Sequence, residues 1–161
     1  MTIEEYNSAV DQYSDNIYRF VLKNLRDEDT AKDIIQDTFE KLWMKRENVS
    51  FQKVKSYLFT TAYHTLIDYI RKQSKVSVWE NINEEKFIYG HQYNDIQEVL
   101  NKAINFLPDI QRSVLLLRDY EGYSYQEISE ITGLNEAQVK VYIYRARIFL
   151  KNYIGKIEIL I

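Results

Sequence analysis

Cysteine is missing from this chain of 161 residues, which excludes disulfides, zinc sites with thiolate ligands and cysteine nucleophiles. Proline occurs once and glycine four times, so the composition favours helices over a turn-rich β fold. No apolar run is long enough to cross a membrane, and no charged-then-apolar leader for secretion is present. The apolar content of 45% is ordinary for a globular protein. We therefore expect a folded, helical, reduced cytosolic protein.

The charge of the chain is small in total but unevenly distributed. The net charge is −3, yet residues 1–40 hold ten acidic and four basic side chains, and residues 41–75 hold two acidic and eight basic ones. Residues 138–156 hold five basic side chains and no acidic one. Binding to nucleic acid depends on local positive stretches more than on the total. The two basic stretches could contact one nucleic acid at two places, while the acidic residues 1–40 suit another partner.

Residues 121–151 have the pattern of a helix-turn-helix. Ser124 followed by Glu127 is a capping box that starts a short helix, and Gly133 allows the tight turn after it. Asn135 followed by Gln138 repeats the capping pattern at the start of a second helix. The residues of that helix expected to face inward are Val139, Ile143, Ala146 and Leu150. The pattern predicts a helix that enters a DNA groove, with a solvated helical hairpin as the alternative.

The rest of the chain predicts further helices and one break. Apolar residues recur at helical spacing from Thr2 to Leu25, from Ala31 to Lys45, from Val54 to Lys72 and on both sides of Pro108. Residues 76–94 lose this periodicity. The predicted fold class is all-α, with two small helical domains at 1–75 and 95–161 joined by a flexible linker at 76–94, the second domain containing the helix-turn-helix. The last five residues, 157–161, are unexpectedly apolar, and the sequence does not assign them a role.

Three segments of the chain, Ala31–Trp43, Val54–Lys72 and Leu107–Pro108 with the helix-turn-helix, in this order resemble the extracytoplasmic-function (ECF) sigma factors of bacterial RNA polymerase. Ala31–Trp43 resembles the helix of that family that binds the polymerase, and Val54–Lys72 resembles the helix that melts the promoter and reads its −10 element. Leu107, Pro108 and the helix-turn-helix resemble the domain that reads the −35 element. The resemblance covers nearly the whole chain. It implies a sigma factor that binds core RNA polymerase and directs promoter-specific transcription initiation.

The resemblance also implies two sites in the first domain. The surface that docks on the clamp helices of the polymerase's largest subunit would consist of Asp33, Gln36, Asp37 and Glu40, which by themselves are typical of a solvated helix face. Reading an unstacked base requires aromatic surfaces, polar groups for the base edge and cations for the backbone. The matching positions are Asn48, Phe51, Phe59, Thr60, Tyr63, His64, Asp68, Arg71 and Lys72.

One of these positions departs from the family. His64 stands where the family usually has an asparagine in the base pocket, and a histidine differs from asparagine in reach and charge state. The base preference at this position is therefore open. His64 and Asp68 are four residues apart and could also form a metal pair, but without a third ligand we favour a structural hydrogen bond between them. We expect no metal and no cofactor.

The −35 element would be read in the major groove of duplex DNA. The positions implied for it are Glu136, Gln138, Lys140, Val141, Tyr144, Arg145 and Arg147. The two cations at 140 and 145 suit phosphates or guanine, and Gln138 suits adenine. Gln138 and Val141 stand where the family commonly has small hydroxyl residues, so an altered −35 sequence is expected. For Tyr142 and Phe149 we favour burial in the core.

Two other kinds of protein remain as alternatives. A stand-alone regulator would bind symmetric DNA as a dimer, although it would not need the Ala31–Trp43 helix. A protein-interaction adaptor would have kept the helix-turn-helix fold without DNA binding. An enzyme is not expected, because the sequence shows no nucleophile–base pair, phosphate loop or metal triad. Members of the ECF sigma family are often held inactive by an anti-sigma factor, commonly anchored in the membrane, so the resemblance implies such a partner.

Overall fold

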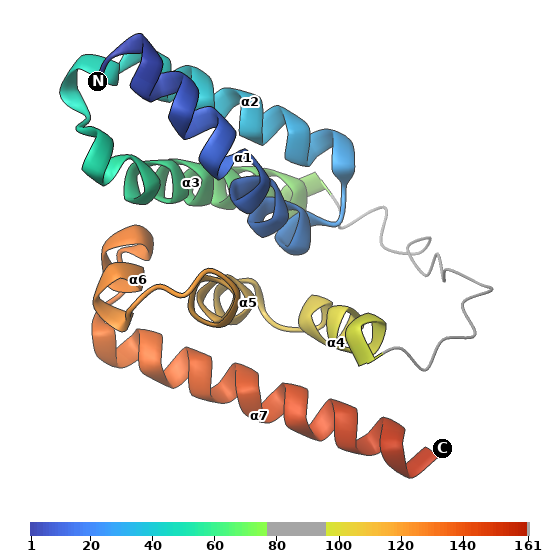
Figure 1. The fold of residues 1–161 in the computed structure, drawn as a ribbon. Helices are drawn as coiled ribbons and strands as arrows, with labels where there is room; N and C mark the ends of the chain where they lie inside the picture. Colours follow the sequence, from blue (N-terminus) through green and yellow to red (C-terminus); the bar gives the residue numbers. More distant parts are fainter. Residues whose placement is uncertain (77–95, 161) are drawn as a thin grey trace.

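The computed structural model describes residues 1–76 and 96–160, and in these ranges it is all-α, as the sequence predicts (Figure 1). The helices are α1 (Ile3–Leu25), α2 (Glu28–Met44), α3 (Val54–Val76), α4 (Ile96–Asn105), α5 (Asp109–Leu115), α6 (Tyr125–Thr132) and α7 (Glu136–Leu160). Two short 3-10 turns, Arg46–Asn48 and Phe51–Lys53, join α2 to α3, and a π-helical segment, η4 (Leu116–Tyr120), follows α5. Beyond Val76, the predicted linker lies outside the described residues.

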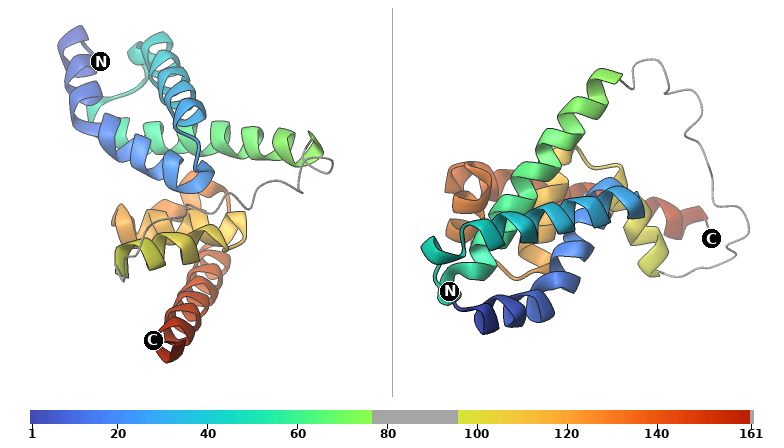
Figure 2. Two further views of the ribbon diagram at one scale, coloured as in Figure 1. Left: turned by 90° about the vertical axis from the view of Figure 1, so that its right-hand side faces the viewer. Right: turned by 90° about the horizontal axis from the view of Figure 1, so that it is seen from above.

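The helices form two groups that pack on each other. Helices α1–α3 form the N-terminal group, and α4–α7 with η4 form the C-terminal group (Figures 1 and 2). The contact between the groups is made mainly by α3 against α6 and by α1 against α4 and α5. The groups share one continuous hydrophobic core. It includes Ile17, Phe20, Leu58, Phe59, Leu116, Tyr123, Ile128 and Ile143.

Helix ends in the N-terminal group follow the capping chemistry of the sequence. Thr2 and Glu5 form the capping box at the start of α1, with bonds of 2.8 and 3.0 Å between each backbone N–H and the other side chain. Helix α1 is followed by the capping residue Arg26, which has a left-handed backbone with φ of 60°. Asp27 then caps α2 by accepting a hydrogen bond from the Asp29 backbone N–H at 3.2 Å. The left-handed Arg26 lets the chain reverse, so α1 and α2 pack side by side.

The helix-turn-helix has the predicted local structure. The Ser124–Glu127 capping box is present, and Gly133 ends α6 with φ of 80°, a conformation that glycine adopts without strain. The Asn135 side chain accepts the Gln138 backbone N–H at 2.8 Å, and the Gln138 side chain accepts the Asn135 N–H at 3.1 Å. These caps set where α6 stops and α7 starts, and so fix which face of α7 is exposed.

Burial along α7 agrees with the predicted inward row, with one correction. The first three members of the row are buried and the fourth is half-buried: Val139, Ile143, Ala146 and Leu150. Tyr142 is also half-buried. The prediction that Phe149 is buried was wrong: it is 36% exposed and its ring stacks on that of Tyr153. Phe149 lies beside the inward row of α7 rather than on it. None of the described helices combines the length and apolar character needed to span a membrane.

Candidate nucleic-acid interface

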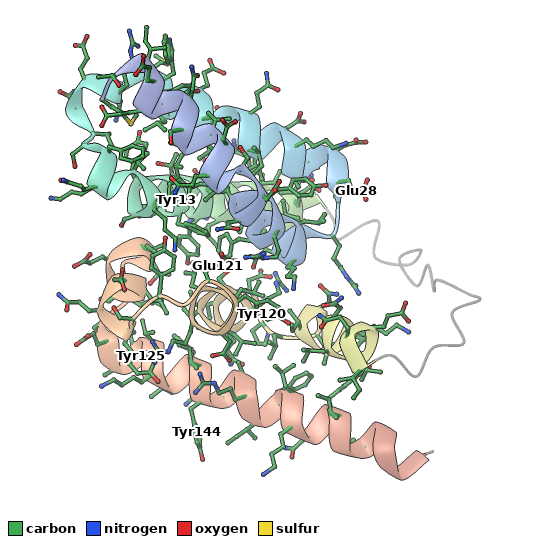
Figure 3. The ribbon with its side chains drawn as sticks, viewed as in Figure 1. Tyr13, Glu28, Tyr120, Glu121, Tyr125 and Tyr144 are labelled. Atoms are coloured by element: carbon green, nitrogen blue, oxygen red, sulfur yellow. The ribbon has the colours of Figure 1, made fainter. Side chains whose placement is uncertain are left out.

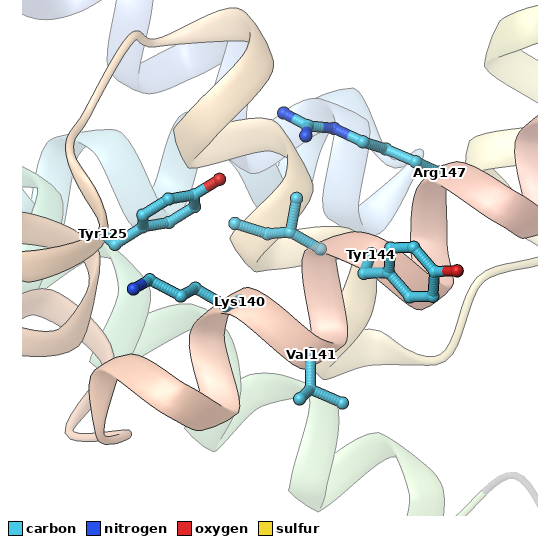
Figure 4. A pocket seen from close by; sticks show the side chains of 6 residues that line it. Tyr125, Lys140, Val141, Tyr144 and Arg147 are labelled. Carbon is cyan, nitrogen blue, oxygen red and sulfur yellow. The ribbon is translucent and has the colours of Figure 1, made fainter.

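Helix α7 presents a continuous exposed face next to α6. The side chains on this face are Glu136, Gln138, Lys140, Val141, Tyr144 and Arg145, all of them exposed. Val141 is 44% exposed and Tyr144 is 66% exposed, so both side chains are available for contact. A pocket of about 350 Å³ beside them is lined by Tyr125, Lys140, Val141, Ile143, Tyr144 and Arg147 (Figure 4). Exposed cations beside apolar and aromatic groups suit contacts with phosphates and base edges.

Tyr125 belongs to this surface and was not among the residues predicted from the sequence. It is the first residue of α6, directly after the capping residue Ser124. The Arg118 guanidinium lies 4.5 Å from the centre of its ring, and the Lys140 ammonium lies 5.5 Å from it. Tyr125 therefore lies against two cations at the start of α6. The sequence signal was its position at the start of the first helix of a helix-turn-helix.

Arg147, a predicted DNA contact, is engaged in an ion pair within the protein. Its Nη2 donates to Asp119 Oδ1 at 2.6 Å and its Nε donates to Asp119 Oδ2 at 3.2 Å. The hydrogen bond to Asp119 is the main cause that raises the pKa of Arg147 above its ordinary value. Asp119 lies on η4, so this pair joins η4 to α7. It also offsets one positive charge at the edge of the exposed face.

Gln138 is partly committed to the capping of α7. Its side-chain oxygen accepts the Asn135 N–H, which leaves the side-chain NH2 group as the free donor. A bidentate contact with adenine uses both the oxygen and the NH2 group of a glutamine. The Gln138 oxygen would have to accept from both Asn135 and adenine in such a contact, so the capping bond restricts how the side chain can turn toward a base.

The residues predicted to read opened DNA lie on α3 and in the turns before it, and they form an exposed, a half-buried and a buried set. Five are exposed and two are half-buried: Asn48, His64, Asp68, Arg71 and Lys72 in the first set, Phe51 and Thr60 in the second. Phe59 and Tyr63 are buried, with exposed fractions of 0% and 5%. The Phe59 ring lies between Phe20 of α1 and Tyr123 of the C-terminal group. Burial and the nearby carboxylate of Asp109 raise the pKa of Tyr63. These two aromatic side chains are thus covered in this structure.

The hydrogen bond expected between His64 and Asp68 is absent. The Asp68 carboxylate instead lies 3.9 Å from the Arg71 guanidinium, and the His64 ring contacts the ring of Tyr63 edge-on, with 5.7 Å between the ring centres. Both side chains of the expected pair are exposed, so solvent competes for their polar atoms. Among the described residues, no cluster of three or more His, Asp or Glu side chains is placed to hold a metal ion.

The acidic face of α2 is open to solvent. Asp33, Gln36 and Glu40 are exposed, and Asp37 is half-buried and lies 3.1 Å from Lys41 in an ion pair. Helix α2 packs on α1 and α3, and it lies on the side of the N-terminal group away from α4–α7 (Figure 1). The predicted docking residues therefore form one accessible surface at the outer edge of the molecule.

Comparison with known proteins matches two parts of the chain to described families. Residues 9–76 match the family described as Sigma-70 region 2, and residues 97–150 match the one described as Sigma-70, region 4. The chain is 34% identical to the ECF RNA polymerase sigma factor SigM of Bacillus subtilis, over 94% of each chain. It is 30% identical to the RNA polymerase sigma factor YlaC of the same organism, over 90% of this chain and 89% of the other.

A solved structure gives the same fold. It is the sigma factor RpoE in complex with the anti-sigma factor NepR from Bartonella quintana, with a TM-score of 0.79, 25% sequence identity, and coverage of 95% of this chain and 98% of that one. The helices, the helix-turn-helix and the two matched regions define a transcription initiation factor of the sigma-70 type. Within that class, the chain belongs to the ECF sigma factors.

Proposed function

We propose that this sigma factor works through three separate surfaces, one for the polymerase and two for the promoter. A sigma factor directs core RNA polymerase to specific promoters and is an initiation factor rather than an enzyme. The polymerase surface is the acidic face of α2 that includes Asp33, Gln36 and Glu40, and its proposed contact is the pair of clamp helices of the largest subunit. This face is exposed and charged, so its electrostatic field should speed the association with the polymerase and orient the docking.

The −35 element is the proposed ligand of the exposed α7 face. Lys140 and Arg145 are exposed and unpaired by any carboxylate among the described residues, so they are available to phosphates or to guanine. Val141 and Tyr144 offer apolar contact, for which the thymine methyl group is a suitable partner. Tyr125 extends this surface toward the DNA backbone.

The −10 element is the proposed ligand of α3 and of the turns before it. His64 and Asp68 offer polar groups for a base edge, and Arg71 and Lys72 offer charge for the backbone of a single strand. Phe59 and Tyr63 are the aromatic surfaces available for an unstacked base once they are uncovered. An anti-sigma factor is a further proposed partner, by analogy with the RpoE complex.

The separation of the three surfaces on the structure is the observation that supports this proposal, and it also gives the test. Changing Asp33 and Gln36 to alanine should abolish binding to purified core polymerase and leave DNA binding through α7 intact. Changing Lys140 and Arg145 to alanine should leave polymerase binding intact and remove the dependence of transcription on the −35 element. If the first pair of changes left polymerase binding unaltered, the α2 assignment would be wrong.

A further inference from the structure

A small pocket lies between the end of α1 and helix α4. Its volume is about 260 Å³, and the residues that line it are Leu22, Lys23, Arg26, Asn101, Ile104 and Asn105. None of them belongs to the three surfaces proposed above. Binding sites for small molecules are mostly apolar hollows of about 300–1,000 Å³ with a few polar groups. This pocket lies near the lower end of that range, which suits a small ligand.

Two cations of the pocket have no carboxylate partner. Lys23 and Arg26 form no ion pair with any described residue. Glu121, the carboxylate that acts on Lys23, is bound by Arg19 at 2.9 Å. Asp27, the residue after Arg26, accepts hydrogen bonds within the cap of α2. Both cations therefore keep a charge with which the anionic group of a ligand can pair.

The surroundings of the two cations disfavour their charge. Burial is the main cause that lowers the pKa of Lys23, and the nearby Arg19 adds to the effect. Partial burial also lowers the pKa of Arg26, with Arg112 adding to it. A group whose charged form is disfavoured by burial and by like charges is stabilised when an anion approaches. An anionic ligand would therefore relieve the repulsion among these cations.

Both cations are held at the edge of the pocket by the local structure. The Lys23 ammonium lies 3.7 Å from the centre of the Tyr120 ring, and Figure 3 shows Tyr120 on the side of the C-terminal group that faces α1. Arg26 is the only non-glycine residue with a positive φ in the described part of the chain. Its N–H donates to the Leu22 carbonyl at 2.7 Å. Such backbone outliers are found preferentially at functional sites.

Helix α4 supplies amides to the pocket, and both helices supply an apolar wall. The Asn105 amide donates to the Asn101 carbonyl at 2.6 Å, and the Asn101 side-chain oxygen accepts from Gln97 at 3.3 Å. These bonds leave the side-chain oxygen of Asn105 and the side-chain NH2 group of Asn101 available to a ligand. The apolar wall consists of Leu22 and Ile104.

We propose that this pocket binds a mononucleotide, with the phosphate on Lys23 and Arg26 and the base against the apolar wall. Cations at a pocket edge suit a phosphate, and amides that offer one donor and one acceptor suit the polar edge of a base. A bare anion would make no use of the apolar wall, and an apolar ligand would make no use of the cations. This site is separate from the proposed sigma-factor surfaces and does not rest on them.

Calorimetric titration of the full chain with the ribonucleoside monophosphates, ribose phosphate and inorganic phosphate tests the proposal. At least one monophosphate should bind, at least about tenfold more tightly than inorganic phosphate, because its base and its phosphate are both held. The same nucleotide should raise the thermal unfolding temperature, since the pocket exists only in the folded chain. Equal affinity for nucleotides and inorganic phosphate would overturn the proposal, and so would the absence of binding by every probe.

Two variants remove the proposed phosphate contacts one at a time. Lys23→Met removes the charge and keeps a long side chain, and Arg26→Asn introduces a residue that tolerates the left-handed backbone. Each should weaken nucleotide binding at least about tenfold, the effect of losing a charge-assisted hydrogen bond. Circular dichroism checks that both variants fold. Lys45→Met removes an equal charge beyond the far end of α2 and should leave the affinity unchanged. Unchanged affinity in both pocket variants would place the ligand elsewhere.

A further control separates the pocket from the proposed DNA surfaces. Changing Lys140 and Arg145 to alanine should leave nucleotide binding unchanged, because neither residue lines the pocket. If this double change removed nucleotide binding and Lys23→Met did not, the nucleotide would be bound by the DNA surface and the proposal would be wrong. Promoter-dependent transcription reports on the proposed function alone, so the two proposals fail independently.

Discussion

Arg19 and Glu121 are 102 residues apart in the chain, yet they form a two-pronged ion pair across the contact between the two helical groups. The pair is asymmetric: the Arg19 side chain is 43% exposed, and the Glu121 side chain is 2% exposed. A buried carboxylate without a partner is unfavourable. The packing of the two groups on each other therefore depends on Arg19 at the surface of α1, because Arg19 is the partner of the buried Glu121 carboxylate.

Replacing Arg19 with methionine should lower the free energy of unfolding by about 1–3 kcal/mol, below the value for a fully buried pair because Arg19 is partly solvated. Equilibrium denaturation measures this change in the free energy of unfolding. Glu121→Met in the same chain should recover most of the loss, because no unpaired buried charge remains. Losses that simply add in the double variant would show that the two side chains are not coupled.

Asn24 satisfies two donors of the other group, so removing it should be more damaging than its size suggests. Asn24→Ala leaves Arg112 Nε and the Ser113 hydroxyl without this acceptor and should destabilise the protein by about 2–4 kcal/mol. Thermal unfolding followed by circular dichroism measures the effect. Asn24→Asp keeps an acceptor toward Arg112 and is the matched control. It should be clearly more stable than the alanine variant.

The Asp119–Arg147 pair predicts that removing a negative charge strengthens DNA binding. In Asp119→Asn the Arg147 guanidinium is no longer offset by a carboxylate and can approach a phosphate. The duplex affinity should rise, and the salt dependence of binding should steepen by about one phosphate contact. Fluorescence anisotropy across a salt series measures both. Adding Arg147→Ala should cancel the gain, and a gain that persists in that double variant would argue against Arg147.

The helix-turn-helix should lose stability in acid through Glu127. Its carboxylate accepts the Ser124 backbone N–H at 2.9 Å, and this bond is the main cause that lowers its pKa. Because the folded pKa is depressed, the stabilisation is fully present above the unfolded value of about 4.3 and is lost as the pH falls through the folded pKa. Glu127→Gln has no titrating group there. The difference in unfolding free energy between the two chains should shrink on acidification, and a difference independent of pH would contradict this origin.

Local features of the fold were readable from the sequence because their causes are local. The capping boxes at Thr2 and Ser124, the turn at Gly133 and the inward row of α7 each depend on side chains within a few positions. The all-α class followed from the same periodicities. The predicted exposure of Lys140, Tyr144 and Arg145 is likewise a consequence of helical spacing.

Contacts between the groups were not readable, because no local pattern encodes them. Phe59 and Tyr63 were predicted as base-reading residues, and nothing near them in the sequence shows that Tyr123 covers Phe59. Within the C-terminal group, the partner of Arg147 was equally unreadable, because Asp119 lies 28 residues away in the chain. The expected His64–Asp68 bond had the right spacing, but exposed side chains have competing partners in solvent and in Arg71.

Promoter-dependent transcription with purified core RNA polymerase, with and without this chain, on fragments of its own genome, tests the central claim most directly. The account predicts discrete new start sites that disappear when Asp33 and Gln36 are changed to alanine. It also predicts that these starts share a −35 element. Transcription should no longer depend on this element when Lys140 and Arg145 are both changed to alanine. No new starts, together with binding of the chain alone to symmetric DNA, would contradict it.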